Sequence, residues 1–115
     1  MSTIGFTTTT FTDEPTALPG LEFAVKNGFH ALELSSNHLW PEVATATELA
    51  RLREDGTRHE IRLSIHFPTR FPLGSLDRSQ RRTGVENLRA TIGIACQIGA
   101  GVVVVHAGDV GGFHT

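Results

Sequence analysis

Short apolar runs alternate along this chain with longer amphipathic segments. Four runs rich in Ile, Val, Leu or Phe predict strands, and turn-forming residues such as Gly, Pro, Asn and Asp bound each of them. Between the runs, apolar residues recur at helical spacing and predict three helices. The strands are expected at 3–11, 31–35, 61–67 and 101–106, and the helices at 18–27, about 41–54 and about 79–98.

The predicted helix boundaries rest on proline and glycine. Pro19 and Pro41 stand where a first-turn proline is tolerated, and Gly28 and Gly99 supply the left-handed residue that often ends a helix. In the third helix, four apolar residues at helical spacing define the face expected to pack on the sheet. These are Val85, Leu88, Ile92 and Ala95, and the neighbouring Cys96 is expected to be a buried small hydrophobic residue.

Regular alternation of strand and helix favours an α/β fold. Strands joined by helical crossovers run parallel, since a right-handed crossover returns the chain to the same end of the sheet. The four valines 102–105 show no polar alternation, as expected for a parallel strand covered on both faces. The chain of 115 residues provides one domain at most. The fold class is therefore α/β, with parallel β/α units comprising four strands and three helices.

Histidine ends two successive predicted strands. His66 is the last polar residue of the run IRLSIHF, and His106 follows four valines. Ligands of parallel α/β folds bind at the carboxyl ends of the strands, so both imidazoles are expected at the same edge of the sheet. A neutral imidazole there binds a divalent metal, donates to or accepts from a substrate hydroxyl, or moves a proton. The structural alternative is a half-buried histidine hydrogen-bonded to a neighbouring carbonyl.

Two further polar residues belong to the candidate site. Glu33 lies between Leu32 and Leu34, where a carboxylate is costly if it is buried without a partner. It either faces a polar mouth at the carboxyl ends of the strands or pairs with Arg or Lys, and the polar mouth is favoured. His38 follows the second strand and stands beside Trp40. It is a candidate substrate contact.

Composition narrows the expected partners. A net charge of −2 gives no indication of a surface that binds nucleic acid. The single cysteine excludes an internal disulfide. The chain has no apolar stretch near the roughly 20 residues that span a bilayer, and its N-terminus lacks the pattern of a secretory signal. A cytoplasmic location without a membrane partner is expected.

Four segments carry a resemblance to a known superfamily. They read GFHALELS at 28–35, LSIHFP at 63–68, the helix at 79–100 and VVVVHAGD at 102–109. In this order they resemble the first half of the xylose isomerase-like TIM barrels, which include sugar-phosphate isomerases and epimerases and the endonuclease IV type of AP endonuclease. The residues that match the superfamily motifs are Gly28, Phe29, Glu33, Leu34, His66, Ser75, Asp77, Arg81, Leu88, Val103 to His106 and Gly108.

The resemblance implies metal-dependent sugar chemistry. In isomerase and epimerase relatives a divalent ion, Mn, Mg, Co or Zn, is held by carboxylates and a histidine from later strands, and the positions of His66 and His106 line the sugar site. In endonuclease relatives the same two positions are zinc ligands. We therefore expect His66, His106, Glu33 and His38 to contact a sugar or sugar phosphate, with His66 and His106 as metal ligands only in an endonuclease. The resemblance assigns no catalytic residue within this chain.

A complete barrel of eight units needs about 250 residues. Residues 1–115 are accordingly expected to form a partial barrel domain, truncated after the fourth strand, and the expected function is the N-terminal portion of a sugar isomerase or epimerase. Two alternatives stay open: an endonuclease IV-like AP endonuclease, and a non-catalytic half-barrel that self-associates. Unpaired edge strands make homo-oligomers of the isolated chain an expected outcome.

Overall fold

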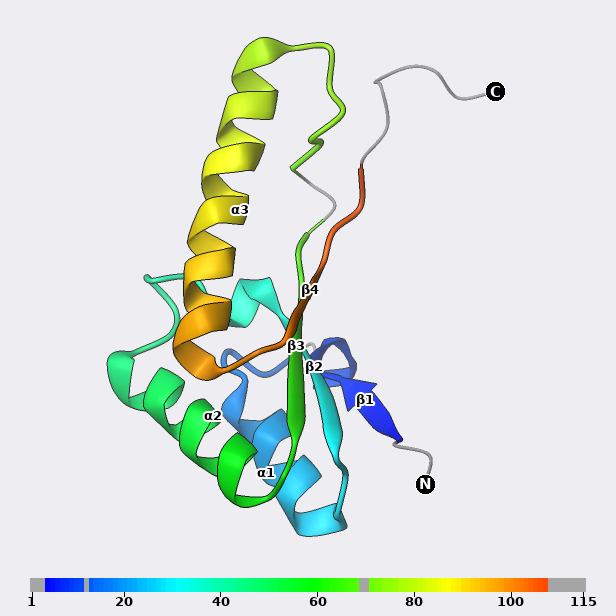
Figure 1. Ribbon diagram of the computed structural model, residues 1–115, viewed down its shortest axis with the longest axis vertical. Coiled ribbons are helices and arrows are strands. Elements are labelled where there is room, and N and C mark those ends of the chain that lie inside the picture. The colour runs from blue at the N-terminus through cyan, green and yellow to red at the C-terminus, as the bar shows by residue number, and fades with distance from the viewer. Residues whose placement is uncertain (1–3, 12, 69–70, 108–115) are drawn as a thin grey trace.

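One parallel sheet, covered on one face by three helices, forms the described part of the chain (Figure 1). The computed structural model describes residues 4–11, 13–68 and 71–107. The strands are β1 (Gly5–Thr7), β2 (Ala31–Ser35), β3 (Arg62–His66) and β4 (Val102–Val104). The helices are α1 (Leu18–Asn27), α2 (Ala46–Arg58) and α3 (Arg78–Ile98), with 3₁₀ turns at Thr8–Phe11 and Ser36–His38.

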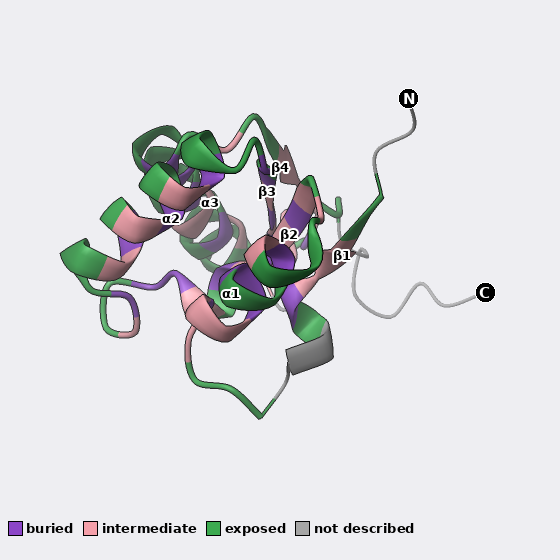
Figure 2. Cartoon of the chain, turned by 90° about the horizontal axis from the view of Figure 1, so that it is seen from below, coloured by how far each residue is buried: buried purple, intermediate pink, exposed green. Residues whose placement is uncertain are grey.

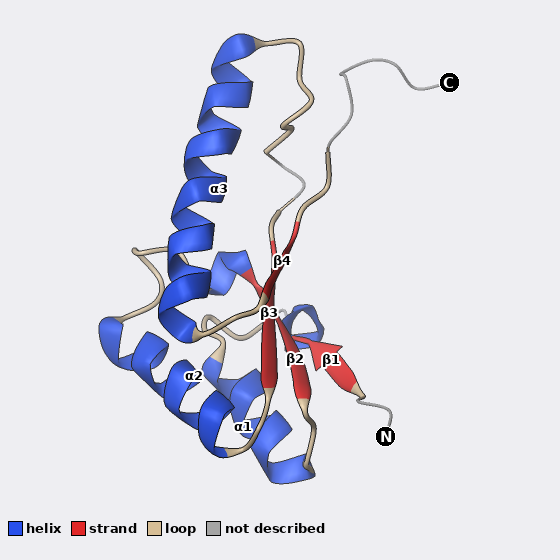
Figure 3. Cartoon of the chain, in the orientation of Figure 1, coloured by secondary structure: helices blue, strands red, loops and turns tan. Residues whose placement is uncertain are grey.

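The strands follow one another in chain order, β1-β2-β3-β4, and every neighbouring pair is parallel. This confirms the α/β class and the succession of four strands and three helices. The helices lie together on one side of the sheet, and the other face is free of them (Figure 3). No helix in the described part of the chain is long and apolar enough to span a membrane.

The two faces of the sheet differ in chemistry because side chains alternate along a strand. Leu32 and Leu34 of β2 and Leu63 and Ile65 of β3 are buried under the helices. The alternate positions form what we call the open face: Thr7, Glu33, Ser35, Ser64, His66 and Val104 share it through the strand register. A polar face and an apolar face thus come from the same strands.

The hydrophobic core lies between the helices and the covered face of the sheet (Figure 2). Leu21 and Ala24 of α1 and Leu52 of α2 are buried against it. Gly28 and Gly99 end α1 and α3 in left-handed conformations, with φ of 71° and 77°, as their positions in the sequence predict. The core therefore holds the strands in place from one face of the sheet, and the open face does not take part in it.

The start predicted for the second helix was wrong. Residues near Pro41 form a turn, in which the amides of Val43 and Ala44 both donate to the carbonyl of Trp40. The helix begins at Ala46 because Thr45 caps it, its side-chain oxygen accepting from the Glu48 amide at 3.1 Å. It continues past the expected end at residue 54 to Arg58.

The face predicted for the third helix was also wrong in part. The buried residues of α3 are Gly84, Thr91, Ala95 and Ile98, whereas Ile92 is 47% exposed and Val85 is exposed as well. Cys96 is exposed, contrary to the expectation that it is buried. The helix is rotated because small residues pack closely against the loop before it: a Cβ on Gly84 would lie 2.9 Å from Cδ2 of Leu73. Only Ala95 of the four expected residues is buried.

Two strand predictions also need correction. The first strand is shorter than expected, since residues from Thr8 onward turn into a 3₁₀ helix. The fourth strand is not covered on both faces, since Val102 is 58% exposed. Within the described residues β1 and β4 each have one neighbouring strand, so both are edges. The expectation that the isolated chain self-associates through such edges stays a prediction.

Candidate functional site at the carboxyl ends of the strands

His66 and His106 meet at the carboxyl end of the sheet. Their Nε2 atoms are 3.0 Å apart, and their ring centroids are separated by 4.9 Å with the planes tilted by 52°. His66 is the last residue of β3, and His106 follows β4 by two residues, so both side chains reach the same edge of the open face. The sheet thus brings together two imidazoles that are 40 residues apart in the sequence.

The contact between the two imidazoles fixes how their protons are arranged. In a hydrogen bond between two ring nitrogens, one nitrogen donates its N–H and the other accepts with its lone pair. One imidazole therefore carries its proton on Nε2, while the neutral partner carries its proton on Nδ1. This edge of the sheet therefore carries one ring nitrogen that donates and one that accepts, side by side.

Glu33 shares the open face with the histidine pair. It is half-buried in β2, and the register places Thr7 on one side of it and Ser64 on the other. Within the described residues its carboxylate forms no ion pair or hydrogen bond. Glu33 thus lies on the open face, and its place at a polar mouth stays a prediction.

His38 has a different environment. Its Nε2–H donates to the carbonyl oxygen of Glu14 at 3.0 Å, which ties the loop before α1 to the 3₁₀ turn after β2. Its Nδ1 is buried and, within the described residues, has no hydrogen-bond partner; the same holds for Oγ of the neighbouring Ser36. One nitrogen of His38 is thus committed to the backbone, and contact with a substrate stays a prediction for this residue.

Backbone bonds seat the segment that carries His106. The amide of Phe67 donates to the carbonyl of Val104 at 2.9 Å and extends the β3–β4 ladder by one step. Beyond this ladder, the amide of Gly74 donates to the carbonyl of Ala107, also at 2.9 Å. The loop that follows β3 therefore holds the residue next to His106.

Ser75, Asp77 and Arg81, which match the superfamily motifs, organise that loop. The hydroxyl of Ser75 donates to the side-chain oxygen of Gln80 at 2.6 Å and accepts from the amide of Asp77 at 3.1 Å. Asp77 caps α3, its carboxylate accepting from the amides of Ser79 and Gln80. The guanidinium of Arg81 donates to the Ser75 carbonyl at 2.6 Å. The matched Gly108 lies outside the described residues.

The cap on α3 gives a pH-dependent prediction. Hydrogen bonds from the Ser79 side chain and from the Ser79 and Gln80 amides hold the pKa of Asp77 below its ordinary value of 3.8. The stabilisation by the ionised cap is therefore complete above pH 3.8 and is lost as the pH falls through the lower pKa of the folded state. Asp77→Ala is expected to lower the Tm by a few degrees at neutral pH.

Thermal unfolding followed by circular dichroism checks this, with Asp77→Asn as the matched control. Asparagine keeps a capping oxygen but cannot be protonated in this range, so its Tm should stay near that of the parent at neutral pH. The difference in Tm between the parent and the Asp77→Asn variant should change only below pH 3.8. An Asp77→Ala variant with the Tm of the parent contradicts the cap.

A metal ion fits this edge only in part. Imidazole nitrogens are good ligands for divalent transition metals, and the two Nε2 atoms are close enough to turn toward one ion. Within the described residues, however, no group of three or more His, Cys, Asp or Glu side chains comes together. The described residues therefore do not make a metal site by themselves.

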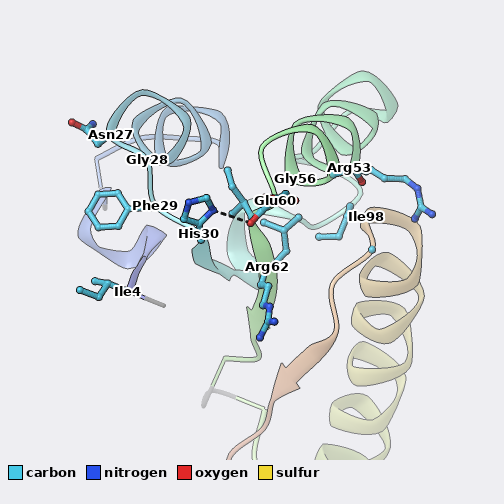
Figure 4. A pocket seen from close by; sticks show the side chains of 14 residues that line it. Ile4, Asn27, Gly28, Phe29, His30, Arg53, Gly56, Glu60, Arg62 and Ile98 are labelled. Atoms are coloured by element: carbon cyan, nitrogen blue, oxygen red, sulfur yellow. Dashed lines mark hydrogen bonds between the residues drawn. The ribbon is translucent and has the colours of Figure 1, made fainter. Parts of the chain in front are cut away.

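A second hollow among the described residues lies at the opposite end of the sheet. It is an open depression of about 1030 Å³ at the amino ends of β2 and β3, between the C-termini of the helices (Figure 4). His30 lies in it, with Nδ1 donating to the carbonyl of Glu60 at 3.2 Å, and Arg62 points away from the other side chains. Ligands of parallel α/β folds bind at the carboxyl ends of the strands, so the histidine pair is the candidate site.

Fold and site together define the class: parallel β/α units whose open face is polar and ends in two converging imidazoles. Residues 21–115 match the xylose isomerase-like TIM barrel family, and the chain belongs to this family. No curated protein sequence gives a significant match.

Solved structures show the same fold. A D-tagatose 3-epimerase-like protein superposes with a TM-score of 0.73 and 23% identity over 93% of this chain. A D-psicose 3-epimerase, determined in the presence of D-fructose, superposes with a TM-score of 0.65 and 21% identity over 76% of this chain. The aligned parts cover 38% and 30% of those two chains, so this chain spans less than half of their length.

Alternation of polar and apolar residues in β2 and β3 is a sequence signal for the open face as a whole, beyond Glu33 and His66. In β3, Arg62, Ser64 and His66 alternate with buried residues, and Glu33 alternates in the same way in β2. That period of two marks one polar and one apolar face. This pattern alone predicts that Ser64 lies on the same face of β3 as His66, whereas its place beside Glu33 follows from the register.

Proposed function

We propose that this chain supplies the first three β/α units and the fourth strand of a sugar isomerase or epimerase. The convergence of His66 and His106 on the open face carries the proposal. A sugar presents adjacent hydroxyl and carbonyl oxygens, and the imidazole pair presents a donor and an acceptor at matching separation. The neighbouring epimerase structures, which share the fold, support a small sugar as ligand.

Each open-face residue has a proposed part in binding. His66 and His106 bind vicinal oxygens of the sugar, and Glu33 accepts a hydrogen bond from a further hydroxyl. These contacts orient the substrate at the mouth and exclude water from one side of it. We assign no proton transfer at carbon to residues of this chain; the remaining barrel units would supply the groups for that step.

A divalent ion, Mn, Mg, Co or Zn, is proposed for the complete protein. Such an ion would polarise the sugar carbonyl and hydroxyl when bound. Because the described residues bring no set of three ligands together, most of its ligands would come from the remaining units. No step of the proposal is routed through the ion.

Turnover of ketohexoses tests the proposal. The protein that carries these units, with Mn²⁺, should convert D-fructose or D-tagatose into an epimer or aldose isomer that chromatography separates from the substrate. Treatment with EDTA should abolish turnover, and returning Mn²⁺ should restore it. Absence of any product from ketohexoses and their phosphates, with each of the four metals, contradicts the proposal.

An endonuclease IV-like activity is the second candidate. The approach of two Nε2 atoms to 3.0 Å favours it, since two imidazoles at one edge are half of a typical zinc site. Against it stands a net charge of −2, because proteins that track phosphates carry excess positive charge. Nicking of abasic DNA with Zn²⁺, in the absence of sugar turnover, would favour this candidate.

A further inference from the structure

Arg81 occupies an unusual position for a cation. It lies in the first turns of α3, where the positive end of the helix dipole disfavours a positive charge. It is half-buried, and its guanidinium reaches back to the Ser75 carbonyl at 2.6 Å, a charge-assisted bond. Arg78 and Arg82 on either side are exposed and, within the described residues, have no ion-pair partner. The Ser75 carbonyl and the nearby carboxylate of Asp77 both interact favourably with this cation, and the hydrogen bond to Ser75 ties it to the loop.

The loop held by Arg81 is also the loop that holds the His106 segment. Ser75 is 9% exposed, and the amide of the preceding Gly74 donates to the carbonyl of Ala107. Leu73 of the same loop packs closely on α3 at Gly84. Apolar packing and the Arg81 bond therefore seat the loop on the helix from two sides.

His106 itself has little else to hold it. Its side chain is exposed, and it stands two residues beyond the end of β4. Within the described residues, the bond from Phe67 holds Val104 before it, the bond from Gly74 holds Ala107 after it, and the imidazole itself bonds to His66. Loss of the Gly74 bond would leave the backbone on the C-terminal side of His106 without this contact.

We propose that Arg81 is a positioning residue for His106, acting through Ser75, Gly74 and Ala107. The guanidinium fixes the loop after β3, the loop fixes the backbone beside His106, and the backbone sets the imidazole against His66. The proposal deepens the proposed function, on which it rests only for the ligand that the histidine pair would bind. Its geometry holds with or without that ligand.

Nitrogen NMR of the two imidazoles tests the proposal without substrate. In the parent chain, one Nε2 should give the signal of a protonated nitrogen and the other that of a bare, hydrogen-bonded acceptor. Arg81→Gln should average or shift both signals, since the imidazoles no longer stay in contact. Arg81→Lys should restore part of the parent pattern, and Arg82→Gln, the matched control, should leave it unchanged.

A second variant tests the hydrogen bond between Gly74 and Ala107, the contact nearest to His106 in the proposed chain of contacts. Gly74→Pro removes the amide that donates to Ala107 and leaves α3 intact, so it should change the imidazole signals as Arg81→Gln does. In the active protein, either variant should lower kcat/KM by about tenfold, less than removal of His106 itself. Folded Arg81→Gln or Gly74→Pro chains with the imidazole signals of the parent overturn the proposal. An effect of Arg82→Gln equal to that of Arg81→Gln overturns it as well.

Discussion

Alanine at His66, and separately at His106, is expected to lower kcat/KM for the sugar reaction by at least about tenfold. Each substitution removes a nitrogen that we propose contacts the ligand, and it leaves the other imidazole without its partner at 3.0 Å. Steady-state kinetics on the protein that carries these units measures the effect.

His59→Ala is the matched control for both histidine variants. His59 is exposed and follows α2, so it lies at the amino end of β3, the opposite end of that strand from His66. Its replacement should leave kcat/KM within about twofold of the parent. Unchanged kinetics in His66→Ala and His106→Ala would return both residues to a structural role.

The second large effect is expected on stability. Ile65→Ala should lower the free energy of unfolding by about 2–5 kcal/mol. Ile65 is fully buried, pairs in register with Leu34 and Val103, and immediately precedes His66. The cavity left by the substitution lies in the centre of the covered face, where the core cannot easily collapse.

Denaturant unfolding at a fixed protein concentration measures this loss, with Ile92→Ala as control. Ile92 is the same residue type but is 47% exposed on α3, so its replacement should change the free energy of unfolding by less than about 0.5 kcal/mol. Equal losses in the two variants would contradict the assignment of the covered face as the core.

The strand order could be predicted because local signals agree with one another. Gly28 and Gly99 end helices in left-handed conformations, and the apolar runs between turn residues match β2 and β3 at their centres. Parallel connection then follows from alternation alone. The meeting of His66 and His106 follows in turn, because parallel strands bring their carboxyl ends to one edge.

Other features depend on competition between signals of similar strength. On α3, the stripe with Val85 and Ile92 and the stripe with Gly84 and Thr91 both have helical spacing. Hydrophobicity favours the first, whereas close packing on Leu73 selects the second. A sequence pattern reports hydrophobicity, but it does not report how closely a helix packs against a neighbouring loop.

The sequence does contain a signal for the start of α2. Thr45 and Glu48 form the spacing of a capping box, which marks a helix start more strongly than a proline in a turn. The role of Arg81 was hidden, because a long side chain that reaches back to Ser75 leaves no periodic trace. Tertiary hydrogen bonds of this kind are visible only in coordinates.

A double-mutant cycle on kcat/KM tests the central claim most directly, namely that His66 and His106 act as one unit on one ligand. If they do, the double alanine variant should lose little more than the worse single variant, because either substitution already breaks the unit. Losses that multiply, with the double variant falling by the product of the two single effects, would show two independent histidines and contradict the account.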